Sequence, residues 1–185
     1  MDDNQIVDLY IRRSESAIAE TNIKYGTLCR QLAMNILSCR EDTEECVNDT
    51  YLGTWNAIPP QMPASLRAFV CGITRNLALK KYAYSTAEKR NSKAAISLTE
   101  LEECVSGCGT PEEALDNAEI AKLISGFLRT LDRENRIMFL RRYWYFDPVT
   151  DIAAYFGGSA GRVSNTLFRT RKKLRAYLLK EGIDL

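Results

Sequence analysis

The sequence contains no histidine, no long apolar run and almost no net charge. Without histidine, Ser-His and Cys-His nucleophile pairs and most catalytic zinc sites are excluded. No run of about 18 apolar residues is present, and residues 1–10, MDDNQIVDLY, are acidic rather than basic and apolar. These absences predict a cytoplasmic protein that has no signal peptide, does not insert in a membrane, is not an enzyme and needs no cofactor.

The six cysteines show no disulfide-scaffold spacing and lie mostly in sequence of helical character. This usage is typical of reduced thiols in a reducing compartment. Cys104 and Cys108 have the spacing of half a metal site, but no histidine is available and the other cysteines are distant in sequence. We therefore predict no metal site. A thiol-based redox or metal sensor, which rests on the cysteines alone, stays open as an alternative.

Strand-like alternation is nearly absent, and apolar residues recur at helical spacing, which together predict an all-α fold. In the first half, helices are expected over about 5–39, 42–58 and 64–82, and the segment PPQMP (59–63) forms a loop. Each helix carries an apolar stripe that is expected to be buried. The stripes are Ile23, Leu28, Leu32 and Ile36; then Val47, Tyr51, Trp55 and Ile58; then Leu66, Phe69, Val70, Ile73 and Leu77.

The composition divides the chain into two small helical domains, 1–84 and 111–185, joined by a flexible linker over 85–110. Residues 66–96 hold seven bases and one acid, whereas 97–120 hold seven acids and no base. Helix-start signals resume after the linker. They are Thr110 with Pro111 and Glu113, Asp132, Asp147 with Pro148, and Ser159.

Residues 157–175, GGSAGRVSNTLFRTRKKLR, carry six Lys or Arg and no acid. With the preceding segment they predict a helix-turn-helix. On a wheel of about 100° per residue, an apolar stripe and a basic face lie on opposite sides of the last helix. A solvated basic face is the alternative, but the capped turn favours DNA binding. The stripe is Val163, Leu167, Leu174 and Leu178, packing on Val149, Ile152, Ala153 and Phe156; the basic face is Arg162, Asn165, Arg169 and Lys172.

Two separate motifs resemble bacterial RNA polymerase sigma factors of the sigma-70 family, extracytoplasmic-function (ECF) class. DIAAYFGGSAGRVSNTLFRTRKKLRAYL resembles the DNA-binding region four, and LRTLDRENRIMFLRRYW resembles the helix pair before it. DTEECVNDTYLGTWNAI and LRAFVCGITRNLALKKY resemble region two. The resemblance covers nearly the whole chain apart from the linker.

The resemblance implies binding and strand separation rather than bond making. Region two is expected to dock on the clamp helices of the largest polymerase subunit and to capture the −10 promoter element as unpaired DNA. Region four is expected to bind the −35 element as duplex beside the polymerase flap. The residues carried over are Asn48 and Asp49 for polymerase; Arg75, Asn76, Lys80 and Lys81 for the −10 element; and Arg162, Ser164, Asn165, Phe168, Arg169, Arg171 and Lys172 for the −35 element.

The sequence departs from the family pattern at both DNA-binding motifs. Ser164, Asn165 and Thr166 stand where many members have a basic-Ser-Arg run, and Lys80 stands where many have an acid. These changes leave the promoter preference open. The sequence also leaves open whether an anti-sigma factor is a partner. A stand-alone helix-turn-helix regulator is the alternative function, although such a regulator has no reason to carry the region-two motifs.

The expected linker predicts where a protease cuts first. Limited proteolysis of the full chain should begin within about 84–110, because segments without packed structure are the preferred sites of nicking. Mass spectrometry of the first fragments measures the cut sites. Early cuts inside 42–82 or 132–180 would contradict the division into two domains.

Overall fold

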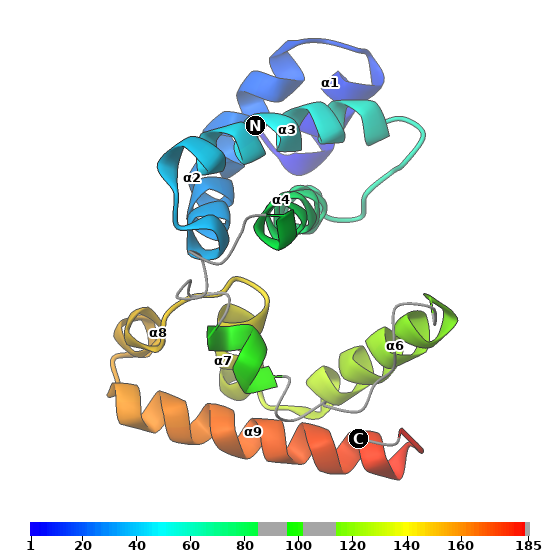
Figure 1. Ribbon diagram of the computed structural model, residues 1–185. Coiled ribbons are helices and arrows are strands. Elements are labelled where there is room, and N and C mark those ends of the chain that lie inside the picture. Colours follow the sequence, from blue (N-terminus) through cyan, green and yellow to red (C-terminus); the bar gives the residue numbers. More distant parts are fainter. Residues whose placement is uncertain (85–95, 102–113, 184–185) are drawn as a thin grey trace. The chain divides into compact units, whose positions relative to one another are not determined.

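Every element in the part of the chain that the structure describes is a helix (Figure 1). The computed structural model describes residues 1–84, 96–101 and 114–183. Contacts between Cα atoms separate two compact units, Met1–Ala94 and Ala95–Leu185, and each is treated by itself below. The all-α prediction is confirmed for the described residues. Within the expected linker, 96–101 form a helical turn that belongs to the second unit.

The N-terminal unit is built around one long central helix, α2, which packs against both α3 and α4. The first helix, α1, begins with a capping box in which the Asp2 carboxylate accepts from the Gln5 amide at 2.9 Å and the Gln5 side chain accepts from the Asp2 amide. The chain then returns twice across α2 to complete the bundle. The helices are α1 (Asp3–Ile11), α2 (Ser16–Leu37), α3 (Arg40–Ala57) and α4 (Leu66–Tyr84).

Buried threonines line the contacts between these helices. Thr50 of α3 donates its hydroxyl to the Cys46 carbonyl at 2.8 Å, and Thr74 of α4 donates to the Val70 carbonyl at 2.9 Å. The two hydroxyl oxygens lie 3.2 Å apart across the α3–α4 contact. A buried hydroxyl costs free energy unless it is hydrogen-bonded, and these satisfy themselves on their own helix. Thr21, Thr43 and Thr54 do the same.

The apolar stripe predicted for α2 is wrong at one position. Leu32 and Ile36 are fully buried as expected, but Ile23 is 76% exposed. Thirteen residues separate Ile23 from Ile36, which at about 100° per residue puts the two on nearly opposite sides of the helix. The inner face instead continues through Cys29, Tyr25 and Thr21. The buried face of α2 therefore contains the polar Thr21 in place of Ile23.

The other two predicted stripes of this unit are largely confirmed. On α3, Val47 and Tyr51 are buried, and Trp55 packs edge-on against Tyr10 at a ring-centroid distance of 6.2 Å. Ile58 is buried just beyond the helix, where it forms the C-cap. On α4 the fully buried members are Leu66 and Val70, whereas Phe69, Ile73 and Leu77 are half-buried.

The C-terminal unit gathers four helices and the 96–101 turn around one apolar cluster. The predicted stripe of α9 is confirmed, since its four apolar members are all at most 2% exposed. Ile152 and Ala153 of α8 are buried against it, and Val149 and Phe156 pack at its edge. The helices are α6 (Ala114–Thr130), α7 (Arg133–Tyr143), α8 (Val149–Phe156) and α9 (Ala160–Lys180).

Two of the predicted helix starts are confirmed and one is wrong. The Asp132 carboxylate accepts from the Asn135 amide at 2.9 Å, and Ser159 Oγ accepts from the Arg162 amide at 3.2 Å. Asp147 does not cap α8, because Pro148 takes the N-cap position. The Asp147 carboxylate is buried and instead accepts from Arg141 Nε at 2.8 Å. The start predicted at Thr110, Pro111 and Glu113 lies outside the described residues.

Two isoleucines on α2 provide a matched test of this packing. Ile36→Ala should lower the free energy of unfolding of the N-terminal unit by about 2–5 kcal/mol, because it leaves a cavity in the core. Ile23→Ala removes the same atoms from an exposed site and should change it by less than about 0.5 kcal/mol. Urea denaturation followed by Trp55 fluorescence, in a Trp144→Phe background, measures both. Equal losses would contradict the orientation of α2.

Candidate nucleic-acid and polymerase interfaces

A tight turn joins α8 to α9 and fixes where the last helix begins. Gly157 ends α8 in the left-handed region with φ of 63°, which a side chain would disfavour. Ser159 then caps α9 from extended backbone. The two helices pack against each other directly, so α8 and α9 form the helix-turn-helix expected from the sequence.

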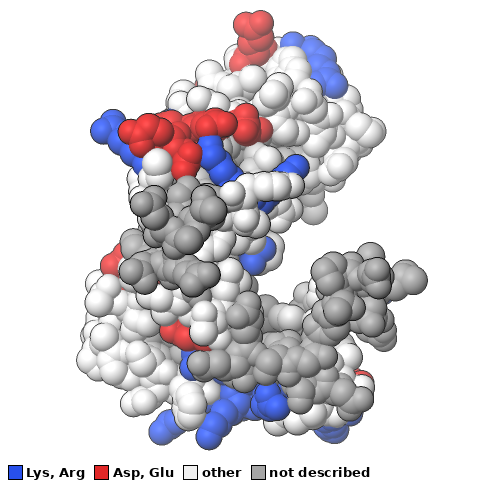
Figure 2. Space-filling model, viewed as in Figure 1, with Lys and Arg blue, Asp and Glu red and all other residues white. Residues whose placement is uncertain are grey.

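The face of α9 opposite the buried stripe is exposed and basic. Arg162, Asn165, Arg169 and Lys172 are all exposed, as the helical wheel predicts. Figure 2 shows Lys and Arg side chains gathered along the outer side of this helix. Contacts to the DNA backbone and to base edges are both made by cationic or amide side chains that can extend from the protein surface. This face offers both kinds of group.

Phe168 gives this basic face an apolar component. Its side chain is 49% exposed, and Lys172 Nζ lies 4.7 Å from the centre of its ring. An ammonium over an aromatic ring is attracted by the negative face of the ring. Ser164, one turn earlier, is also exposed. The structure therefore brings six of the seven residues predicted for the −35 element to the exposed side of α9.

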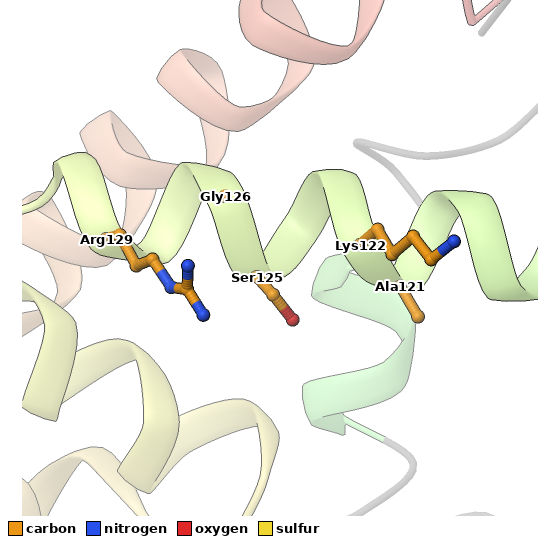
Figure 3. A pocket seen from close by; sticks show the side chains of 5 residues that line it. All are labelled: Ala121, Lys122, Ser125, Gly126 and Arg129. Atoms are coloured by element: carbon orange, nitrogen blue, oxygen red, sulfur yellow. The ribbon is translucent and has the colours of Figure 1, made fainter.

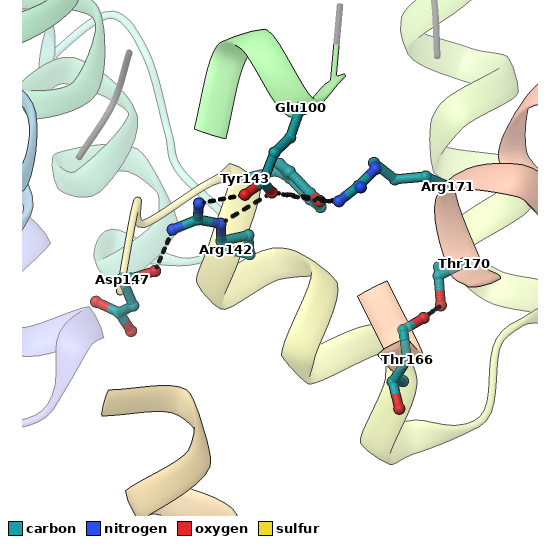
Figure 4. Close-up of polar contacts among 7 residues, drawn as sticks. All are labelled: Glu100, Arg142, Tyr143, Asp147, Thr166, Thr170 and Arg171. Carbon is teal, nitrogen blue, oxygen red and sulfur yellow. Dashed lines mark hydrogen bonds and ion pairs between the residues drawn. The ribbon is translucent and has the colours of Figure 1, made fainter. Parts of the chain in front are cut away.

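Arg171 is the seventh, and it turns inward (Figure 4). Its side chain is 13% exposed, and Nη1 donates to the Tyr143 hydroxyl at 2.6 Å and pairs with Glu100 at 3.2 Å. Arg162 also has an internal partner, Glu134, at 2.6 Å, but both side chains of this pair stay exposed. Water screens such a surface pair, so it holds Arg162 weakly. The fold therefore holds the side chain of Arg171 much more firmly than that of Arg162.

Sequence reasoning missed Glu100 and Tyr143. Glu100 lies in the segment that composition assigns to a linker, 42 residues before Arg142 and 71 before Arg171. No local pattern connects positions so far apart. Tyr143 is buried at the end of α7, and burial raises the pKa of its hydroxyl, with Arg171 opposing that shift. The signal available in the sequence was the tyrosine itself, because a buried tyrosine hydroxyl needs a hydrogen-bond partner.

The four residues predicted for the −10 element do not share one environment. Asn76 and Lys80 are exposed on α4, whereas Arg75 is half-buried. Burial lowers the pKa of the Arg75 guanidinium. Lys81 is held against α3 by Asp42 at 3.0 Å and by Glu45. The hydrogen bond with Glu45 is the main cause that raises the pKa of Lys81, so its charge is already compensated within the unit.

The predicted polymerase contacts lie on the outer side of α3. Asn48 and Asp49 are both exposed, while Thr50 and Val47 beside them are buried. Figure 2 shows a group of acidic side chains over this helix. The exposed acids of α3 are Glu41, Glu44, Glu45 and Asp49, of which Glu45 pairs with Lys81 and Glu44 lies 3.4 Å from Arg30. This side of α3 is therefore a negatively charged surface, suited to a basic partner.

The described cysteines do not form a metal centre. Cys29, Cys46 and Cys71 are buried, and burial raises the pKa of Cys46 to about 12, which keeps its thiol protonated at neutral pH. No group of three or more potential metal ligands occurs among the residues that the structure describes. Cys104 and Cys108 fall outside those residues.

One open hollow lies along α6 (Figure 3). Its lining comes from a single side of that helix, with Lys122, Ser125 and Arg129 projecting beside Ala121 and Gly126. None of the residues predicted from the sequence lines it. The lining carries two cations and no acid, and it shows no arrangement of groups typical of a catalytic site.

A family model matches part of the N-terminal unit. Residues 23–87 match the model of sigma-70 region 2, a segment that contains α3 and α4 with all the predicted −10 and polymerase residues. The segment that holds α3 and α4 is therefore similar to region 2 of the sigma-70 family, whose members act with RNA polymerase in transcription initiation.

Other comparisons add little to that assignment. A search of curated proteins finds no match. Among solved structures, one described as CnrH in complex with the cytosolic domain of CnrY matches with 19% sequence identity and a TM-score of 0.45. The match covers 95% of this chain and 96% of that one. In the described part of the chain, no helix has the length and apolar content to cross a bilayer.

Proposed function

We propose that this chain is a sigma factor of the ECF class that directs core RNA polymerase to a subset of promoters. One observation carries the proposal: a sigma-70 region 2 occurs in the same chain as a separate helical unit that has a cationic recognition helix. The first would bind polymerase and the −10 element, and the second the −35 element. The two motifs quoted from the sequence support the assignment to the ECF class.

In this proposal α9 enters the major groove of the −35 element. Arg169 and Asn165 are exposed and chemically able to bond base edges, and Lys172 can bind phosphate. Phe168 can contact a thymine methyl group, with Lys172 held over its ring. The two-helix contact through Ile152 and Val163 supplies the rigid support that base reading requires.

At the −10 element, Asn76 and Lys80 are the α4 side chains most available to DNA, since both are exposed. Arg75 would need to leave a half-buried position to make the same contact. The loop after Ile58 corresponds to the segment that receives a flipped base in ECF sigma factors. Flipping costs a few kcal/mol, which a pocket that reads the extruded base offsets.

A stand-alone helix-turn-helix regulator is the alternative. It accounts for α8 and α9 but not for the match of residues 23–87 to sigma-70 region 2. It also leaves the acidic outer side of α3 without a purpose, whereas docking on a basic polymerase surface uses it directly. The sigma-factor proposal therefore explains both units of the chain.

Asp49→Arg should weaken binding to core RNA polymerase by roughly tenfold or more, because it places a cation against a basic partner. Asp8→Arg, the same charge reversal at an exposed site on α1, is the matched control and should bind as the unmodified chain does. Titration of labelled chain with core polymerase measures both. Equal affinities for the two variants would remove Asp49 from the proposed interface.

Arg169→Ala should reduce discrimination at one −35 base pair, to which a good bidentate contact contributes about 1–3 kcal/mol. Lys172→Ala should instead weaken binding to all duplexes alike and lower the salt dependence by about one phosphate contact. A salt series of titrations on matched and mismatched −35 duplexes separates the two effects.

Both positions lie opposite the buried stripe, so thermal melts should match those of the unmodified chain. Lys180→Ala, at the far end of α9, is the control for loss of a cation outside the proposed contact. If Arg169→Ala and Lys172→Ala lose affinity equally on every duplex, α9 holds only the DNA backbone and base reading lies elsewhere.

A further inference from the structure

The helical turn 96–101 is packed into the C-terminal unit. Ser97 is 1% exposed, and Leu101 packs against the apolar cluster to which α6, α7, α8 and α9 all contribute. Glu100 projects from the turn toward the ends of three side chains on α7 and α9 (Figure 4). The sequence assigns this segment to a linker. Its contacts make it part of the unit that contains the helix-turn-helix.

Glu100 meets Arg142 in a bidentate ion pair. Its Oε1 lies 2.6 Å from Arg142 Nη2, and its Oε2 accepts from Arg142 Nε at 3.1 Å. The Arg142 side chain is only 5% exposed, and its remaining Nη1 donates to the Asp147 carbonyl at 3.3 Å. A buried guanidinium requires both a counter-charge and partners for its donors. Glu100 supplies the counter-charge from outside the helix-turn-helix.

The same carboxylate also binds α9. Arg171 Nη1 lies 3.2 Å from Glu100 Oε2 and donates to the Tyr143 hydroxyl, which in turn donates to Oε2 at 3.1 Å. One acid therefore joins the 96–101 turn to α7 through Arg142 and Tyr143, and to α9 through Arg171. Such a network resists rotation of α9 about its own axis, because any rotation breaks the contacts of Arg171.

We infer that Glu100 is a positioning residue that anchors α9 to α7 and holds Arg171 away from the DNA surface. The unit that reads DNA then begins before residue 100, and Arg171 acts through Glu100 and Tyr143 rather than on a base or a phosphate. The anchoring role stands on the contacts alone. The statement about DNA rests on the proposed function.

Hydrogen exchange on the full chain tests the anchor. Glu100→Gln keeps the shape of the side chain but removes the negative charge that faces two poorly exposed guanidinium groups. We expect amides of α7 and α9 near Phe139 and Leu174 to lose protection by about 10- to 100-fold.

Amides of α2 to α4 are the internal control, and their protection should not change. Glu181→Gln, which removes an exposed carboxylate from the same unit, should change protection by less than about twofold. Equal protection in Glu100→Gln and Glu181→Gln would overturn the anchoring role.

A double-variant cycle tests whether Glu100 acts through Arg171. Because the two side chains share contacts, the loss of protection in Glu100→Gln with Arg171→Gln should be several-fold smaller than the product of the two single losses. Arg169→Gln is the matched control, since Arg169 lies on the same helix but is exposed. The loss of protection in Glu100→Gln with Arg169→Gln should therefore equal the product of the two single losses. Independent behaviour in both pairs would overturn the link to Arg171.

Salt-dependent binding to a −35 duplex tests the withdrawal of Arg171 from DNA. Lys172→Gln should lower the salt slope by about one contact, whereas Arg171→Gln should leave the slope unchanged. Arg171→Met, which keeps an apolar stem, is the second variant. Failure of both Arg171 variants to fold would also support the inference, because an exposed DNA contact can be removed without unfolding. An equal fall in slope for Arg171→Gln and Lys172→Gln would overturn the inference.

If the unmodified chain binds no promoter duplex, the proposed function fails, while the exchange data still decide the role of Glu100.

Discussion

Burial of the apolar stripe on α9 determines which side of that helix meets the solvent. Val163, Leu167, Leu174 and Leu178 recur at helical spacing and are all but fully buried, so the residues on the opposite side must point outward. The cationic face is a geometric consequence of this packing. The short turn through Gly157 and Ser159 then sets the angle at which α8 supports that face.

Local sequence patterns predict much of this architecture because helices are specified locally. The spacing of apolar residues predicted the buried stripe of α9, and the capping residues Asp132 and Ser159 predicted two helix starts. The pattern failed at Ile23, where a buried threonine on the inner face of α2 satisfies its own hydroxyl and so can replace an apolar residue. The cap predicted at Asp147 is wrong for a related reason, because its carboxylate binds Arg141 instead of capping α8.

The predicted interface residues differ most in how their charge is balanced, and this the sequence does not reveal. Arg169 and Lys172 are exposed, whereas Arg171 has an acid from a distant segment beside it. Lys81 is compensated by two acids of α3. A run of cations in sequence therefore overstates the charge available to a partner. Only the contacts between distant segments distinguish cations that support the fold from those that can bind DNA.

The threonines of the N-terminal unit have a mechanical consequence. Each donates its hydroxyl to a carbonyl four residues earlier in the chain, so this bond does not depend on the neighbouring helix. Directional contacts between the helices are also present, among them the 3.2 Å contact between Thr50 and Thr74 and the ion pairs of Lys81 with α3. A displacement of α3 against α4 would break these contacts and leave the bonds within each helix intact. Under a load on α3, the contacts between helices are therefore the first to be lost.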